Sequence, residues 1–102
     1  MTVNRALAIA RQRCDMHRMG GGWIITHYDP TVDAMRELYS RPYAQAREDL
    51  TQIQADEALR ALGHTPDAYG WPLAVVQTIE GRGTLRSRVE NAVAHLRPVK
   101  RN

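Results

Sequence analysis

The chain has 102 residues and a formal net charge of +3. This length suits one domain, because domains commonly hold about 100 to 200 residues. The single cysteine, Cys14, excludes an intrachain disulfide and a zinc site built on paired thiolates. No apolar run approaches the ~20 residues that cross a bilayer, and no signal-peptide pattern is present. We therefore expect one soluble, cytoplasmic domain over residues 1–102, with a frayed tail at residues 98–102.

Charge and apolar residues are unevenly distributed along the chain. Residues 1–20 hold four arginines and one aspartate, residues 21–79 hold eight acidic residues and four arginines, and residues 80–102 hold six basic and two acidic residues. Leu, Ile and Val make up only about a fifth of the chain, whereas alanine occurs thirteen times. This composition predicts closely packed helices around a small core.

The first forty residues predict a helix, a strand and a second helix. Val3, Leu7, Ala10, Cys14 and His17 share one helical face, so a helix is expected over residues 2–18, ending at the glycines of residues 20–22. Residues 23–28 are rich in β-branched and aromatic side chains and predict a strand. Asp29 as N-cap and Pro30 at the first helical position then predict a helix that stops near residue 40, before Pro42.

The second half predicts a long helix, an ambiguous segment and a last helix. Apolar residues at helical spacing predict a helix over residues 42–62, which Gly63 ends. Residues 71–80 favour a strand through their β-branched residues, although Pro72 followed by Leu73, Val76 and Ile79 also suits a short helix. Thr84 or Ser87 begins a final helix that ends before Pro98.

These elements predict an α+β fold of four helices and a small two-stranded antiparallel sheet, in the order α-β-α-α-β-α. In this arrangement residues 71–80 pair with residues 23–28, and Trp23 and Trp71 each open a strand. The alternative is an all-α bundle in which residues 71–80 are helical.

The turn before the last helix is the strongest candidate for a charged ligand. A glycine-containing turn followed by a helix N-terminus offers free N–H groups and a positive dipole end to an anion. This predicts a site for a phosphate, a nucleic acid or an acidic partner at Arg82, Gly83, Thr84, Arg86 and Arg88. The competing interpretation is a polar turn with solvated arginines around an ordinary helix cap.

A protein interface is the second prediction. Tyr39 and Tyr43 flank the joint between two predicted helices and, with Arg41 and Arg47, have the composition of an interface hot spot. The acidic helix over residues 42–62 either faces a basic partner or pairs with the basic terminal helices of its own chain.

No residue pattern predicts catalysis, a cofactor or a metal. Cys14 and His17 lie three residues apart as half of a metal site would, but their place on the apolar stripe favours structural burial. Asp29 is spaced to orient His27 as a catalytic base, yet no nucleophile stands beside the pair.

The sequence therefore predicts a small, non-catalytic binding protein. We expect it to act on a larger protein or nucleoprotein machine as an inhibitor or adaptor, because its surface carries both charge signs. The alternative is direct nucleic-acid binding through the C-terminal arginines, and a homodimer is also compatible with the sequence. An enzyme using His27 and Asp29 is the third and least favoured class.

Overall fold

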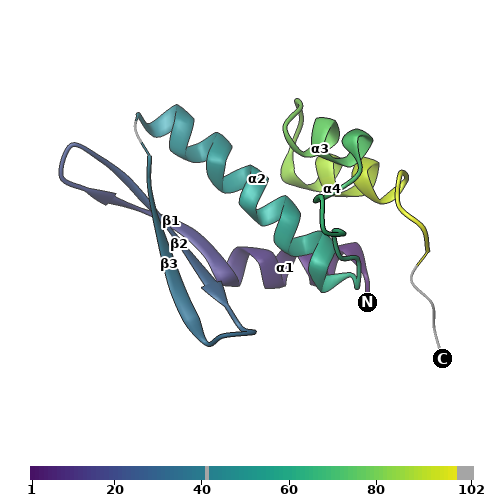
Figure 1. Cartoon of the computed structure of the whole chain (residues 1–102). Coiled ribbons are helices and arrows are strands. Elements are labelled where there is room, and N and C mark those ends of the chain that lie inside the picture. Colours follow the sequence, from purple (N-terminus) through teal and green to yellow (C-terminus); the bar gives the residue numbers. More distant parts are fainter. Residues whose placement is uncertain (41, 99–102) are drawn as a thin grey trace.

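A computed structural model describes residues 1–40 and 42–98 of the chain. In chain order it contains α1 (Val3–Arg13), β1 (Cys14–Met19), β2 (Gly22–Asp29), β3 (Ala34–Ser40), α2 (Tyr43–Ala61), α3 (Leu73–Ile79) and α4 (Leu85–Val93). The strands form one antiparallel sheet in the order β1-β2-β3, and the helices lie to one side of it (Figure 1). The α+β class is confirmed, and the all-α alternative is wrong. Residues 99–102, most of the predicted tail, lie outside the described residues.

The first predicted helix is too long, because its last five residues, 14–18, belong to β1. Helical hydrogen bonding continues until the N–H of Cys14 donates to Ala10, and the backbone of Cys14 is then extended. Side chains alternate from there, so that Cys14 is buried and Asp15 is exposed. Met19 pairs with Gly22 across a two-residue turn, in which Gly20 has a φ of +57°. Pairing with β2 provides hydrogen-bond partners for the backbone of β1. This stabilisation outweighs the preference for a helix that the spacing of the side chains indicated.

The predicted helix over residues 30–40 is also wrong, since this segment contains β3. Asp29 does accept hydrogen bonds from a residue that follows it, as a helix N-cap would. Its carboxylate accepts from the N–H and the hydroxyl of Thr31, but it does so in a turn and not at a helix N-terminus. Asp33 has a φ of +47°, which interrupts any helix there. The chain reverses at this turn, and β3 pairs with β2 along its own full length, from Asp29↔Ala34 to Trp23↔Ser40. The sheet therefore has three strands, where two were expected.

Residues 71–80 do not form a strand, and the helical alternative for this segment is correct. Pro72 precedes α3, where its fixed φ of −52° suits a helix start. Val75 and Ile79 are buried on one side of α3 against the other helices. Trp71 consequently does not pair with Trp23, whose ring instead packs edge-on against Tyr43 with centroids 5.1 Å apart.

The long helix and the last helix are confirmed, and they complete two cores. Thr84 caps α4 by accepting from the N–H of Ser87. The larger core joins the four helices through alanines and a few larger side chains: Ala6, Leu7, Ala10, Ala55, Ala58, Leu59, Val75, Ile79, Val89 and Ala92. The smaller core lies between the sheet and α2 and consists of Cys14, Ile25 and Leu50, with Met16 and Ile53 beside them. Alanine lets the helices approach closely, as its abundance predicts.

Candidate functional site

A groove runs between β3 and α2 and continues to α3. It consists of two adjoining hollows of about 360 Å³ each, which share Leu38, Gln52 and Ile53. We call it the β3–α2 groove; its further lining residues are Arg36 and Tyr39 on β3, Asp49 and Asp56 on α2, His27 on β2, and Trp71, Val76, Ile79 and Glu80 at the α3 end. Apolar walls with a few polar groups are typical of a binding groove.

The groove exists because α2 covers only part of the sheet. Met16, Ile25 and Leu38 form one row across the three strands, on the face that looks toward α2. Ile25 in the middle of the row is completely buried, whereas 48 % of Leu38 on β3 is exposed. The inner face of the sheet is therefore packed under β1 and β2 and left half open at β3.

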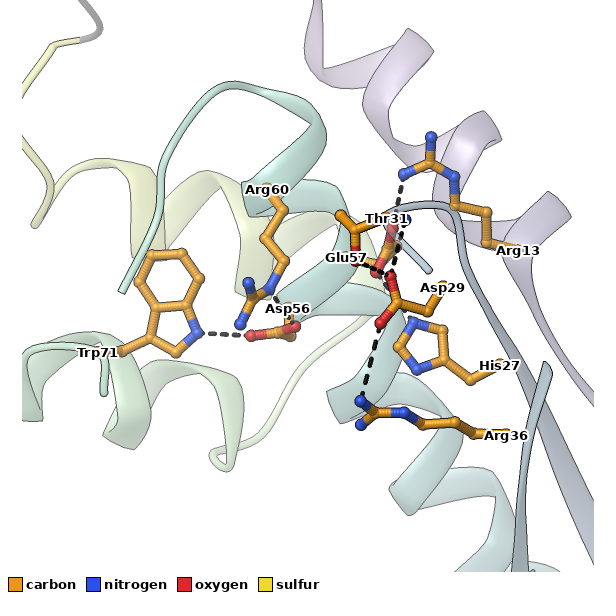
Figure 2. Close-up of polar contacts among 9 residues, drawn as sticks. All are labelled: Arg13, His27, Asp29, Thr31, Arg36, Asp56, Glu57, Arg60 and Trp71. Atoms are coloured by element: carbon orange, nitrogen blue, oxygen red, sulfur yellow. Dashed lines mark hydrogen bonds and ion pairs between the residues drawn. The ribbon is translucent and has the colours of Figure 1, made fainter. Parts of the chain in front are cut away.

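A further hollow of about 450 Å³ adjoins the groove at His27, Arg36 and Asp56 and is built on a buried carboxylate, that of Glu57 on α2. Its side chain is only 6 % exposed and accepts from Arg13 Nη1 at 2.6 Å (Figure 2). The second carboxylate oxygen of Glu57 lies 3.0 Å from Nε2 of His27. Arg13 is the last residue of α1 and His27 lies on β2, so three elements meet at this carboxylate. A buried charge is tolerated only when it is paired in this way.

Two further ion pairs surround this centre. Arg36 lies 3.7 Å from Asp29, which also accepts from Thr31. Asp56 accepts from Arg60 Nε at 2.9 Å and from the indole N–H of Trp71 at 2.6 Å (Figure 2). The bond to Thr31 is the largest cause that lowers the pKa of Asp29. Acidic and basic side chains balance at this end of the groove, so it does not select a strongly charged ligand.

His27 and Glu57 form an imidazole–carboxylate pair, and among residues 1–40 and 42–98 no activated nucleophile stands beside it. His27 contacts Glu57 and not Asp29, the carboxylate of the least favoured catalytic hypothesis. Cys14 stands opposite His27 in the β1–β2 register, but it is 1 % exposed. Burial, followed by the nearby charge of Glu57, raises the pKa of the Cys14 thiol to about 12, so the thiol stays protonated at neutral pH.

Cys14 is buried, as its place on the apolar stripe predicted, whereas the same expectation for His17 is wrong, because His17 is exposed; the two residues do not meet as metal ligands. The two residues lie three apart on a strand, so Cys14 faces α2 and His17 faces the opposite side. In the described part of the chain, no three His, Cys, Asp or Glu side chains gather as a metal site requires.

The structure disperses the predicted C-terminal arginine cluster. Arg88 is buried and forms a bidentate pair with Glu48, at 2.7 and 2.8 Å, and it also donates to the carbonyl oxygens of Gly83 and Ile79. Its hydrogen bonds are the largest cause that lowers the pKa of Glu48. Arg86 instead donates to Asn4 and lies 3.8 Å from Glu90. Arg82 is exposed at the turn, and Thr84 serves as the helix cap.

The predicted interface residues are also spread over several elements. Tyr39 lies on β3, Tyr43 begins α2 and packs on Trp23, and Arg41 lies outside the described residues. Arg47 lines a separate hollow of about 570 Å³, together with Arg11, Gly83 and Thr84. Arg47 of the predicted interface therefore meets Gly83 and Thr84 of the predicted anion site at this hollow, an arrangement that the sequence did not indicate.

Of the residues on the outer face of the sheet, only Tyr39, which also borders the groove, was among the predicted interface residues. We call this outer face the open face; the register assigns to it Asp15, His17, Ile24, Thr26, Tyr28, Met35, Glu37 and Tyr39. None of these side chains is buried, and Met35 is 60 % exposed. The alternation of residues 14–19 was the available signal, but the helical spacing that runs into it concealed the strand.

Comparisons with protein families, with characterised proteins and with solved structures find no match to this chain. Among residues 1–40 and 42–98, no helix has the length and apolar character that a membrane crossing needs. The chemistry of the β3–α2 groove and of the open face is therefore the basis for assigning a function.

Proposed function

We propose that this protein is a small, non-catalytic binding protein that uses its sheet to contact a larger protein or nucleoprotein machine, as an adaptor or inhibitor. The observation that carries the proposal is that the sheet is only partly covered by helices. The single strand β3 exposes three large side chains, Met35, Leu38 and Tyr39. Exposed apolar and aromatic side chains that gather on one element are typical of protein interfaces.

The charges of the open face favour a protein partner over bare nucleic acid. Asp15, Thr26 and Glu37 form one row across the three strands, so that a carboxylate stands on each side of the central strand. These carboxylates repel phosphate groups and attract basic side chains. A partner that presents apolar residues around a lysine or arginine complements this face.

The test is capture of partners from the source cells by three forms of the full chain. Met35→Glu places a charge on the open face, and Leu73→Glu is the matched control, because Leu73 is 71 % exposed on α3 away from the sheet. Both substitutions are at exposed sites and are expected to leave the thermal unfolding midpoint unchanged.

The proposal predicts a partner that the wild type and Leu73→Glu retain, that Met35→Glu loses, and that survives nuclease treatment. Equal retention by both variants contradicts a role for the sheet. If nuclease treatment removes the partner from the wild type and from both variants, the preference for a protein contact is contradicted.

One observation favours a second candidate, direct nucleic-acid binding. The hollow beside the start of α4 is lined by two exposed arginines, Arg11 and Arg47, and by the turn residues Gly83 and Thr84. This candidate predicts retardation of nucleic acid in a gel at low salt, lost in the double variant Arg11→Ala, Arg47→Ala and weakened steeply by added salt. Absence of retardation at low salt excludes it.

A further inference from the structure

We propose that the β3–α2 groove and the outer edge of β3 together bind an extended peptide segment of a partner protein, which adds to the sheet as a fourth, antiparallel strand. This inference rests on the proposed protein-binding function and names the chemistry of the segment. It is carried by three observations: the edge is unpaired, a groove lies along its inner side, and the charges of β3 alternate between the two faces.

The edge is the first observation. The strand order is β1-β2-β3, so within the described residues one side of β3 has no strand paired to it over Ala34–Ser40. Every second residue of an edge strand turns its N–H and C=O outward, and these groups form a template for another strand. The side chains of residues 34–39 are all exposed, so none of them blocks the approach.

The groove is the second observation. An added strand places every second side chain on the inner face, beside Leu38 and above Ile53 and Val76. An apolar side chain at the position opposite Leu38 covers that half-exposed residue and extends the row that begins with Met16 and Ile25. Backbone pairing thus supplies affinity and the groove supplies selection, as in other cases of strand addition.

The alternating charges are the third observation, and they define the segment. Glu37 points to the open face, where the next strand would bring a residue directly opposite it. Arg36 points to the groove side, where it lies 3.7 Å from Asp29 and its side chain remains 68 % exposed. The complementary segment therefore carries, in order, an apolar residue opposite Leu38, a basic residue opposite Glu37 and an acidic residue opposite Arg36.

The same charges disfavour a second copy of the chain as the occupant. Two β3 strands related by a twofold axis overlap over all seven residues only when Glu37 faces the Glu37 of the other copy. Like charges directly opposite each other destabilise strand pairing. A partner segment with a basic residue at that position removes the conflict.

The test uses two synthetic seven-residue peptides of identical composition and the full-length protein. The matching probe is Thr-Thr-Leu-Lys-Glu-Val-Thr, which places Leu, Lys and Glu opposite Leu38, Glu37 and Arg36 when it runs antiparallel. The control probe exchanges the Lys and the Glu. Binding is followed by the backbone amide signals of the labelled protein in NMR titrations.

We expect the matching probe to shift the β3 amides and to bind about tenfold more tightly than the control. The double variant Arg36→Glu, Glu37→Arg should reverse this preference. Two further peptides carry N-methyl groups on alternate amide nitrogens of the matching probe. Methylation of the nitrogens whose N–H groups face β3 should abolish binding, and methylation of the nitrogens that point away from β3 should preserve it.

Three outcomes overturn the proposal: no β3 shift at about 1 mM peptide, equal binding of the two probes, or concentration-dependent β3 shifts without peptide, which would assign the edge to a second copy. The partner capture described above is independent of these probes. A partner lost in Met35→Glu together with a failed peptide titration therefore rejects the strand addition and leaves the protein-binding function standing.

Discussion

At the scale of single residues, Glu57 shows why the site could not be predicted from the sequence. It lies within an acidic stretch of a long helix, where a solvated or partner-facing carboxylate is the ordinary expectation. Its partners Arg13 and His27 are 44 and 30 positions away in the chain and reach it from the end of α1 and from β2, so both contacts depend on tertiary packing. Arg88 was predicted to bind an anion for the same reason, since its partner Glu48 is 40 positions distant.

Glu57→Gln should lower the free energy of unfolding by about 2 kcal/mol, because it leaves the guanidinium of Arg13 without its buried counter-charge. Chemical denaturation measures this loss. The matched control is Glu90→Gln, which removes a carboxylate that lies 3.8 Å from Arg86 and is 53 % exposed; no measurable change is expected there. Equal effects of the two substitutions would show that Glu57 is not a structural centre.

The Glu48–Arg88 pair predicts a dependence of stability on pH. The pKa of Glu48 is lower in the folded chain than its ordinary value of 4.5, chiefly because Arg88 donates hydrogen bonds to the carboxylate. The stabilisation from the ionised carboxylate is therefore complete above that ordinary value and is lost as pH falls through the lowered one.

Denaturation midpoints measured from about pH 6 to about pH 3 should thus fall more steeply for the wild type than for Glu48→Gln. The difference between the two proteins should be largest at neutral pH and shrink in acid. Parallel curves would mean that this pair contributes no pH-dependent stability.

At the scale of elements, α2, α4 and the central strand β2 could be predicted from local sequence. The apolar residues of the two helices recur at helical spacing, and β2 is rich in β-branched and aromatic residues. The strands β1 and β3 could not be predicted in this way. Helical spacing continues across the α1–β1 junction, and Asp29-Pro30 has the form of a helix start. Pairing on both sides of β2 decides both segments, and such long-range pairing leaves little trace in local spacing.

The turn between β1 and β2 gives a direct test of this strand assignment. Gly20 has a φ of +57°, whereas Gly21 is not in the left-handed region, and neither position is crowded around an added Cβ. Gly20→Ala should therefore cost about 1 kcal/mol of unfolding free energy, and Gly21→Ala should cost almost nothing. The two variants have the same composition, so equal midpoints in chemical denaturation would argue against the hairpin.

At the scale of the whole molecule, some charges of the basic–acidic–basic pattern pair with each other within the folded chain. The acidic helix α2 pairs with the terminal segments through Glu57–Arg13 and Glu48–Arg88, which is one of the two arrangements the sequence suggested. The surface that we propose for a partner is the sheet, with its open face, the edge of β3 that has no paired strand within the described residues, and the groove beside it. The charge pattern alone could not indicate this surface, because it is created by the two strands that local spacing conceals.

Hydrogen exchange of the full chain, measured alone and with the partner captured from the source cells, tests the central claim most directly. If the sheet is the contact surface, binding should slow exchange of the β3 amides over Ala34–Ser40 and leave those of the turn at residues 81–84 unchanged. Slowed exchange confined to that turn and the start of α4, with β3 unaffected, would contradict the claim.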